Sequence, residues 1–230
     1  MSKFSVVLMT AGVGAGLDAG GALVKVDGRE CLLRSVELFL NRDNISQIQL
    51  AVLPAAMEEA KRKFGGHLGF SGVKLVSGGP GWLEQWAAAA EKVSAECSHV
   101  LIHDAARPAV AYSDIDALMN EAEKHSIVAL GAVLRSTIAQ VEESGRPISL
   151  NAPQRFMQVV TPWALTRGKF LELAQAKRGP EAGEIVLLRG SSLNIRVNGG
   201  SDAALAKVMI GMLPKPKIRA ADNPFEEAQW

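Results

Sequence analysis

The residues best suited to chemistry lie in three short motifs, each directly behind an apolar segment. Gly12, Gly14 and Gly16 follow the apolar run 4–8, Gly78-Gly79 follows a second run, and His103-Asp-Ala-Ala-Arg-Pro108 follows a third. Glycines allow successive backbone N–H groups to point at an anion. An arginine can hold a phosphate with two hydrogen bonds, and a carboxylate together with phosphate oxygens suits Mg²⁺. The motifs therefore predict a phosphate site with a divalent cation.

Each motif also has an ordinary structural explanation. A glycine cluster alone is equally typical of a strand-to-helix turn without a ligand, Asp104 could cap a turn, and Arg107 could pair with a surface carboxylate. Their shared position favours a site, because ligands of doubly wound sheets bind at the carboxyl ends of the strands. Thr137 and Thr161 follow predicted strands in the same way, so we expect them at the same edge.

Segments with strand and helix patterns alternate along the chain. Strands are expected at 5–9, 45–53, 73–76, 99–102, 127–133, 156–160, 185–188 and 195–197. Helices are expected at 29–41, 55–64, around Trp82 and Trp86, and at 113–124, 165–175 and 201–212. This alternation predicts an α/β fold with a doubly wound, mostly parallel, Rossmann-like sheet, in a single domain spanning 1–212.

Two segments depart from the alternation. Residues 138–150 alternate in polarity around the turn sequence Glu142-Glu-Ser-Gly145, which predicts a small β-arm leaving the sheet. Residues 213–230 lack periodicity and contain Lys-Pro-Lys and Asp-Asn-Pro, so an extended or disordered tail is expected there.

Composition excludes several classes of protein. Among 230 residues, 25 Lys and Arg balance 24 Asp and Glu, so the charge of +1 provides no broad field for nucleic acid or an anionic membrane. No segment approaches the ~20 apolar residues of a membrane helix, and no signal peptide is evident. Cys31 and Cys97 lack CxxC spacing, which argues against a zinc site or disulfide framework and favours a reducing cytoplasm.

The block His103–Pro108, behind a glycine-rich N-terminal loop, resembles the signature of the 2-C-methyl-D-erythritol 4-phosphate cytidylyltransferases and related polyol-phosphate cytidylyltransferases. The resemblance extends to about residue 212. Weaker elements occur in the order found in the family: Asp27–Val36, Gly78-Gly79, Ser136–Ile138, Val160–Trp163 and Asn194–Val197 with Asp202.

The resemblance implies transfer of CMP from CTP to a sugar-alcohol phosphate, with Mg²⁺, on the route to isoprenoid precursors. It also implies a homodimer joined through the arm at 138–150. The nucleotide-binding positions it implies are Ala11, Gly12, Gly14, Gly16, Gly78, Gly79 and Ala105. Arg107, Thr137, Arg155 and Thr161 would bind the polyol phosphate, Arg196 and Asp104 would be catalytic, and Asp104 would also hold the metal.

Several positions differ from the family pattern. Its loop arginine appears as Gly16 and its Pro-Lys pair as Gly20-Gly21, the arginine and serine after the second glycine turn as Trp82 and Gln85, the aspartate before Thr137 as Ser136, and the closing lysine as Arg196. Losing one cation at a transferring phosphate costs ~10²-fold or more in rate. Two hypotheses follow: an active enzyme in which Arg196 supplies the fixed cation, or a weak or inactive relative that binds nucleotide, phosphate or a partner.

A third hypothesis is a nicotinamide-dependent oxidoreductase built on the same glycine loop. The glycine spacing is not that of GxGxxG, and the second predicted strand ends at Leu53-Pro54 with no acidic residue for a ribose. Both observations place this hypothesis well behind the first two.

Overall fold

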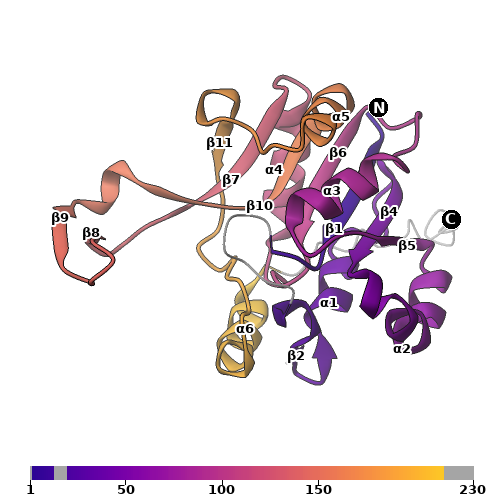
Figure 1. Cartoon of the computed structure of the whole chain (residues 1–230), viewed down its shortest axis with the longest axis horizontal. Coiled ribbons are helices and arrows are strands. Elements are labelled where there is room, and N and C mark those ends of the chain that lie inside the picture. Colours follow the sequence, from indigo (N-terminus) through magenta and orange to yellow (C-terminus); the bar gives the residue numbers. More distant parts are fainter. Residues whose placement is uncertain (1, 13–19, 215–230) are drawn as a thin grey trace, which may run out of the picture.

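A seven-stranded sheet with helices on both faces forms the body of the protein, in a computed structural model that describes residues 2–12 and 20–214 (Figure 1). The strand order is β11-β7-β10-β6-β1-β4-β5. Strand β10 is antiparallel to both neighbours, and the other pairings in this sheet are parallel. The predicted mostly parallel sheet is therefore confirmed. Its strands are β1 (Phe4–Met9), β4 (Ile45–Val52), β5 (Val73–Ser77), β6 (His99–Asp104), β7 (Ile127–Val133), β10 (Met157–Thr166) and β11 (Val186–Arg189).

Helices cover the sheet in two layers. Residues of α1, α2 and α4 pack in one buried cluster, and residues of α3 and α5 pack in another on the opposite face. A sixth helix, α6, packs instead against the short β2–β3 hairpin. The bounds are α1 (Cys31–Glu37), α2 (Met57–Phe70), α3 (Trp82–Ala90), α4 (Tyr112–Ala122), α5 (Arg167–Ala176), α6 (Gly200–Met212), β2 (Lys25–Val26) and β3 (Arg29–Glu30).

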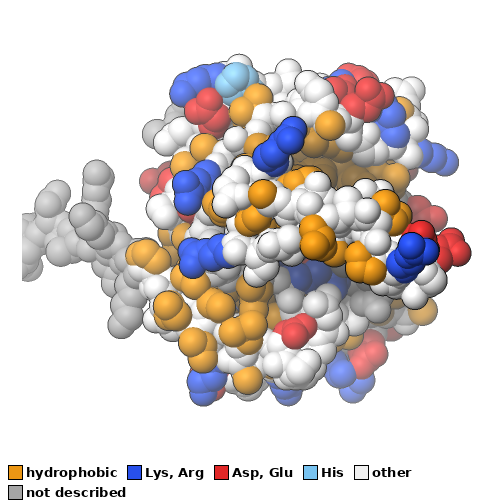
Figure 2. Space-filling model, turned by 90° about the vertical axis from the view of Figure 1, so that its left-hand side faces the viewer, with side chains coloured by type: hydrophobic (Ala, Val, Ile, Leu, Met, Phe, Trp, Pro, Cys, Tyr) orange, Lys and Arg blue, Asp and Glu red, His pale blue; other side chains and the backbone are white. Residues whose placement is uncertain are grey.

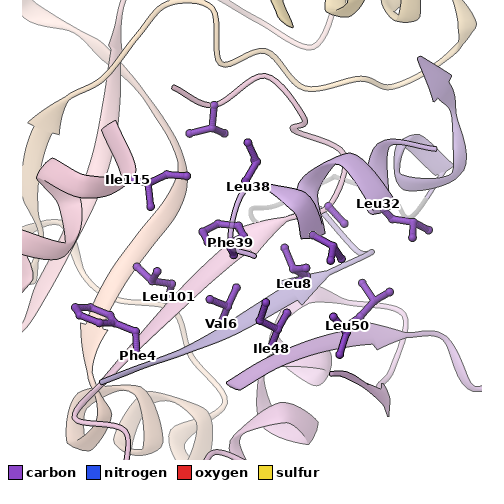
Figure 3. Close-up of a cluster of buried hydrophobic side chains, with 14 of the residues drawn as sticks. Phe4, Val6, Leu8, Leu32, Leu38, Phe39, Ile48, Leu50, Leu101 and Ile115 are labelled. Carbon is purple, nitrogen blue, oxygen red and sulfur yellow. The ribbon is translucent and has the colours of Figure 1, made fainter. Parts of the chain in front are cut away.

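Strand β1 is buried on both faces, which explains why its sequence is a continuous apolar run. Val6 and Leu8 point into the cluster beneath α1 and α2, as Figure 3 shows. Val7 and Met9 point into the cluster beneath α3 and α5. Burying each large apolar side chain contributes about 1.5–3 kcal/mol. The strand that precedes the glycine loop is thus held firmly from both sides.

Aromatic packing joins α3 to α5 on the second face. The rings of Trp86 and Phe170 stack with centroids 5.1 Å apart, and the Trp86 indole N–H donates to the Phe170 carbonyl at 3.3 Å. Trp82, one turn earlier in α3, contacts both Trp86 and Trp163 of β10. This packing fixes the start of α3 beside the Gly78-Gly79 turn.

Gln49 is a polar side chain on the same face of the sheet as this aromatic cluster. It is fully buried on β4, and neither its Oε1 nor its Nε2 has a hydrogen-bond partner among the described residues. Gln47, two residues earlier, accepts from the Ser5 hydroxyl and the Ser94 N–H and donates to the Lys92 carbonyl. The same amide group is therefore satisfied at one position and unsatisfied at the other.

We expect Gln49→Met to raise the free energy of unfolding by about 1–2 kcal/mol, because burying an unsatisfied amide is costly and methionine has a similar shape. Gln47→Met is the matched control and should lower the free energy of unfolding, since it breaks three hydrogen bonds. Urea unfolding of both variants tests the difference. A loss of stability in Gln49→Met would contradict the expectation.

Several expected elements differ from the structure. The helix expected at 29–41 is shorter, since Arg29–Glu30 forms β3 and α1 ends at Glu37, and the helix expected at 55–64 continues in α2 to Phe70. Strand β10 was expected to end before Thr161-Pro162 but continues to Thr166, with a shift of register against β7 between Val160 and Trp163. The expected strand at 195–197 is wrong. Its backbone forms no ladder and is held instead by the Val197 N–H, which donates to the Ala106 carbonyl at 2.8 Å.

The arm is a hairpin of β8 (Ile138–Val141) and β9 (Pro147–Asn151) that extends well away from the sheet (Figure 1). Its turn contains Gly145 with φ of +83°, a left-handed conformation that favours glycine. In the part of the chain that the structure describes, no helix is long and apolar enough to cross a membrane. Most of the expected tail, residues 215–230, lies outside the described residues.

Candidate functional site

Asp104, the last residue of β6, is the centre of a buried charge cluster. Its Oδ2 accepts from Nε of Arg196 at 2.8 Å, and Nε of Arg107 lies 3.8 Å from the same oxygen. Its Oδ1 accepts from the Ala106 N–H at 2.9 Å. The structure thus brings together three of the predicted site residues, and it does so around a carboxylate whose two oxygens are both engaged.

Short backbone links hold this cluster at the end of β6. The Asp104 N–H donates to Oγ1 of Thr161 at 3.1 Å, so a residue of the neighbouring strand β10 holds the backbone of Asp104 in place. The Arg107 N–H donates to the Asp104 carbonyl, and Nε2 of His103 donates to the Arg107 carbonyl at 3.0 Å. Burial lowers the pKa of His103 to about 3, so the imidazole is neutral in the native protein. His103 therefore stabilises the backbone of the motif through its hydrogen bond to Arg107.

Asn194 joins the closing segment to the cluster, a role that the sequence interpretation did not assign. Its carbonyl accepts from Nη1 of Arg107 at 3.0 Å, and its Nδ2 donates to the Thr161 carbonyl at 2.7 Å. The available signal was an asparagine between the apolar residues Leu193 and Ile195, which is typical of a buried amide. Asn194 therefore links Arg107 and Thr161, which both contact Asp104.

The cluster contains one carboxylate and two guanidinium groups, so it carries one net positive charge. The side chains of Asp104, Arg107 and Arg196 are 0%, 8% and 6% exposed. Burial lowers the pKa of Arg107, and the neighbouring carboxylate opposes that shift. A buried, fixed positive charge at the carboxyl end of a parallel strand is suited to an anion such as phosphate.

Asp104, the predicted ligand of the divalent cation, is engaged by other groups in this arrangement. Both carboxylate oxygens already accept hydrogen bonds, and two guanidinium groups lie beside them. Among the described residues, no group of three or more His, Cys, Asp or Glu side chains could hold a metal. The described residues therefore offer no cluster of protein ligands for the Mg²⁺ predicted from the sequence, and Asp104 as its ligand stays a prediction.

The second half of the site lies between the end of β1 and the Gly78-Gly79 turn. Gln85 of α3 is fully buried there, and its Oε1 accepts from the Ala11 N–H at 3.1 Å. Its Nε2 donates to the Thr10 hydroxyl and to the Gly79 carbonyl, both at 3.2 Å. The predicted nucleotide residues Ala11 and Gly79 thus lie on opposite sides of one carboxamide. Gly12 is buried beside them, whereas Gly14 and Gly16 lie outside the described residues.

Gly21, just beyond the glycine loop, is packed against the closing segment. A Cβ atom at Gly21 would overlap the Val197 carbonyl oxygen and lie 3.0 Å from the Ala106 Cβ. The Gly20–Leu23 turn can therefore approach residue 197 only because position 21 has no side chain.

The remaining predicted residues occupy other positions. The Ala105 N–H donates to the Met9 carbonyl, so this N–H links the ends of β6 and β1. Thr137 and Arg155 are both exposed, one just before β8 and one in the turn after β9. The structure places these two at the base of the arm and outside the charge cluster.

Comparisons with known proteins all identify the same family. The model of the family described as 2-C-methyl-D-erythritol 4-phosphate cytidylyltransferase matches residues 4–211. A protein of that description from Solibacter usitatus (strain Ellin6076) is 22% identical over 233 residues, covering 90% of this chain and 96% of its own length. Another, from Clostridioides difficile (strain 630), is 25% identical over 142 residues, or 61% of this chain and 60% of its own.

A solved structure shares the fold. The crystal structure of 4-diphosphocytidyl-2C-methyl-D-erythritolsynthase from Anaerococcus prevotii DSM 20548 is similar with a TM-score of 0.74 at 15% sequence identity. The alignment covers 91% of this chain and 96% of that chain. The architecture of the sheet and its helices is therefore retained although few residues are shared.

Proposed function

The chain belongs to the 2-C-methyl-D-erythritol 4-phosphate cytidylyltransferase family, and from this premise we propose that it transfers CMP from CTP to 2-C-methyl-D-erythritol 4-phosphate or a related polyol phosphate. This reaction serves the synthesis of isoprenoid precursors. The oxidoreductase hypothesis has no support, since the match to the family model spans residues 4–211.

The observation that carries the proposal is the buried cluster of Asp104, Arg107 and Arg196 at the end of β6. The cluster is held in place by hydrogen bonds that Asp104 and Arg107 donate to two other segments, at Thr161 and Asn194. A preorganised cation stabilises the charge of a transferring phosphoryl group without reorganising during the reaction.

In the proposed reaction, a phosphate oxygen of the polyol phosphate forms a bond to the α-phosphorus of CTP. The bond between that phosphorus and the bridging oxygen to the β-phosphate breaks, and pyrophosphate leaves. The chain contributes orientation and fixed charge, which are the main sources of catalysis in phosphoryl-type transfers. We assign the fixed charge to Arg196 and expect Mg²⁺ to enter with the triphosphate of CTP.

One observation favours slow turnover. Arg196 lies in an ion pair with Asp104, so part of its charge is already neutralised before any nucleotide binds. The two loop cations of the family pattern are also replaced by glycines, the arginine by Gly16 and the lysine of the Pro-Lys pair by Gly21. A weak relative that binds nucleotide with little transfer is therefore the second candidate function.

The test is pyrophosphate release from CTP with 2-C-methyl-D-erythritol 4-phosphate and Mg²⁺, together with calorimetric titration of CTP. We expect turnover, and a loss of ~10²-fold in kcat on Arg196→Met, because a fixed cation is removed. Arg189→Met changes an exposed arginine at the end of β11 and should keep the wild-type rate. Binding of CTP without turnover would establish the second candidate, and absence of both would refute a nucleotide function.

We also propose that the protein is a two-fold symmetric homodimer joined through the arm. Large hydrophobic side chains are exposed on the arm and at its base, and Figure 2 views the molecule from this side. They are Val141, Ile148, Leu150, Phe156, Met157 and Val159. A contiguous set of exposed apolar side chains is typical of an interaction surface, and a β-hairpin that extends from the body suits exchange between two copies.

Wild-type protein at micromolar concentration is expected to have about twice the monomer mass of 24.4 kDa in light scattering. Leu150→Glu should weaken dimerisation by ~10²-fold, since each substitution enters a two-fold interface twice and the loss of one buried leucine costs about 1.5–3 kcal/mol. Phe70→Glu is the control, because Phe70 is 95% exposed at the end of α2 on the body of the protein. A monomeric wild-type protein would refute the proposal.

A reducing, cytoplasmic location is consistent with the thiols. Cys31 and Cys97 are both free and buried, and burial raises the pKa of the Cys31 thiol to about 11. We infer that these cysteines need no oxidising compartment.

A further inference from the structure

The guanidinium group of Arg196 is held at two of its nitrogen atoms by side chains from different parts of the chain. Nε donates to Oδ2 of Asp104 at 2.8 Å, and Nη1 donates to Oδ1 of Asn198. The Arg196 side chain is 6% exposed, whereas Asn198 lies at the surface. Because a guanidinium group is planar, contacts at two nitrogens fix both its place and its plane. Asn198 therefore restrains the group to which we assign the fixed charge.

The amide of Asn198 is itself held by Asp202 in the first turn of α6. Oδ2 of Asp202 accepts from the Asn198 backbone N–H at 2.8 Å and from its Nδ2 at 3.2 Å. These hydrogen bonds hold the pKa of Asp202 below its usual range, so the carboxylate is ionised at neutral pH. With a carboxylate on one side and a guanidinium on the other, the amide must present its N–H₂ group to Asp202 and its oxygen to Arg196.

The four side chains form one line of hydrogen bonds from the start of α6 to the end of β6, in the order Asp202, Asn198, Arg196, Asp104. The two acceptors of Arg196 differ in charge. Asp104 is a carboxylate and neutralises part of the cation, whereas the amide of Asn198 is neutral and orients the cation without cancelling its charge. An arginine that is ordered in the folded protein loses less side-chain entropy when it meets an anion.

We propose that Asn198 is a positioning residue for Arg196. It sets the plane of the guanidinium group, and Asp202 holds the Asn198 amide in the orientation that this requires. The inference rests on the proposed function for the part that Arg196 plays at a transferring phosphate. The order of the guanidinium group can be measured in the protein without substrate, so the inference and the proposed function can fail separately.

Proton–nitrogen NMR of the arginine side chain tests the positioning in the protein alone. A hydrogen bond at Nη1 slows rotation about the Cζ–Nη1 bond, so the wild type should show separate Nη1 proton signals, assigned to Arg196 by their loss in Arg196→Met. These signals should merge in Asn198→Ala, and also in Asn198→Ser, whose side chain is shorter. Ser201→Ala changes an exposed residue in the first turn of α6 and is the control in which they stay separate.

Steady-state kinetics of CMP transfer tests the consequence for the reaction. Asn198→Ala should lower kcat by about tenfold, less than the loss on Arg196→Met, because the charge remains but its position is no longer fixed. KM for CTP should change by less than about twofold, since the fixed cation acts on charge that develops in the transition state. In the Arg196→Met background, Asn198→Ala should have no further effect on kcat, because it acts through Arg196.

Thermal unfolding verifies that each variant folds. Merged Nη1 signals in the wild type, or separate signals in the folded Asn198 variants, would overturn the inference. An equal loss of kcat in both backgrounds would also overturn it, because it would show a structural role that does not pass through Arg196, as would an unchanged kcat in folded Asn198→Ala. If the wild type transfers no CMP, the proposed reaction fails, and the NMR comparison still decides whether Asn198 positions Arg196.

Discussion

Replacing Asp104 by asparagine is expected to lower the free energy of unfolding by about 3–5 kcal/mol, the usual cost of leaving a buried charge without its partner. The substitution keeps the size of the side chain but leaves Arg107 and Arg196 facing each other in a site where both are almost fully buried. An asparagine amide can also direct its N–H₂ group at a guanidinium, which adds repulsion. Chemical denaturation at neutral pH measures the loss.

A matched substitution tests whether the loss of stability depends on the burial of the ion pair. Asp116→Asn also removes a carboxylate paired with an arginine, Arg42, but the Asp116 side chain is 59% exposed. Exposed ion pairs contribute about 0–1 kcal/mol, so this variant should be nearly as stable as the wild type. In the double variant Asp104→Asn/Arg196→Met, part of the lost stability should return, because one of the two neighbouring guanidinium groups is removed as well. Equal losses in Asp104→Asn and Asp116→Asn would contradict the assignment of a buried cluster.

Lowering the pH from 7 to 5 is expected to remove about 2 kcal/mol of stability through His103 alone, at ~1.4 kcal/mol for each pH unit below the unfolded pKa. The pKa of this imidazole is about 3 in the native protein and near 6.5 in the unfolded chain. Between these values the unfolded chain binds the additional proton, so stability rises with pH and is lost as the pH falls below about 6.5. Burial also lowers the pKa of His99, which acts in the same direction.

Urea unfolding at pH 7 and pH 5 measures this loss, and proton NMR of the ring verifies that His103 stays neutral in the native protein at pH 5. His103→Gln should reduce the difference in stability between the two pH values by about 2 kcal/mol. His125→Gln removes an exposed imidazole at the end of α4 and is the control. A native His103 that titrates above pH 5 would contradict the prediction.

The parts of the fold that depend on local apolar patterns could be predicted from the sequence. Strand β7 begins and ends at the predicted residues, since its continuous apolar run is buried on both faces of the sheet. Strand β10 could not be predicted in full because Thr161-Pro162 resembles the end of a strand. Its antiparallel direction depends on the path of the arm, which a local pattern does not encode.

The proximity of some predicted residues could be foreseen from the sequence, whereas their contacts could not. The motif at 103–108 indicated Asp104 and Arg107, and the structure places both in one cluster with Arg196. The sequence did not show that Arg196 would neutralise Asp104, because the two residues are far apart in the chain. Gln85 was also hidden, since a glutamine at the start of a helix resembles a solvated surface residue and only the three-dimensional packing shows its burial.

The close approach of Gly21 to Val197 limits which residues position 21 can accept. Any side chain there would overlap the Val197 carbonyl oxygen. A Gly21→Lys substitution would therefore displace the segment that carries Arg196, the partner of Asp104, before it could add a positive charge beside the glycine turn.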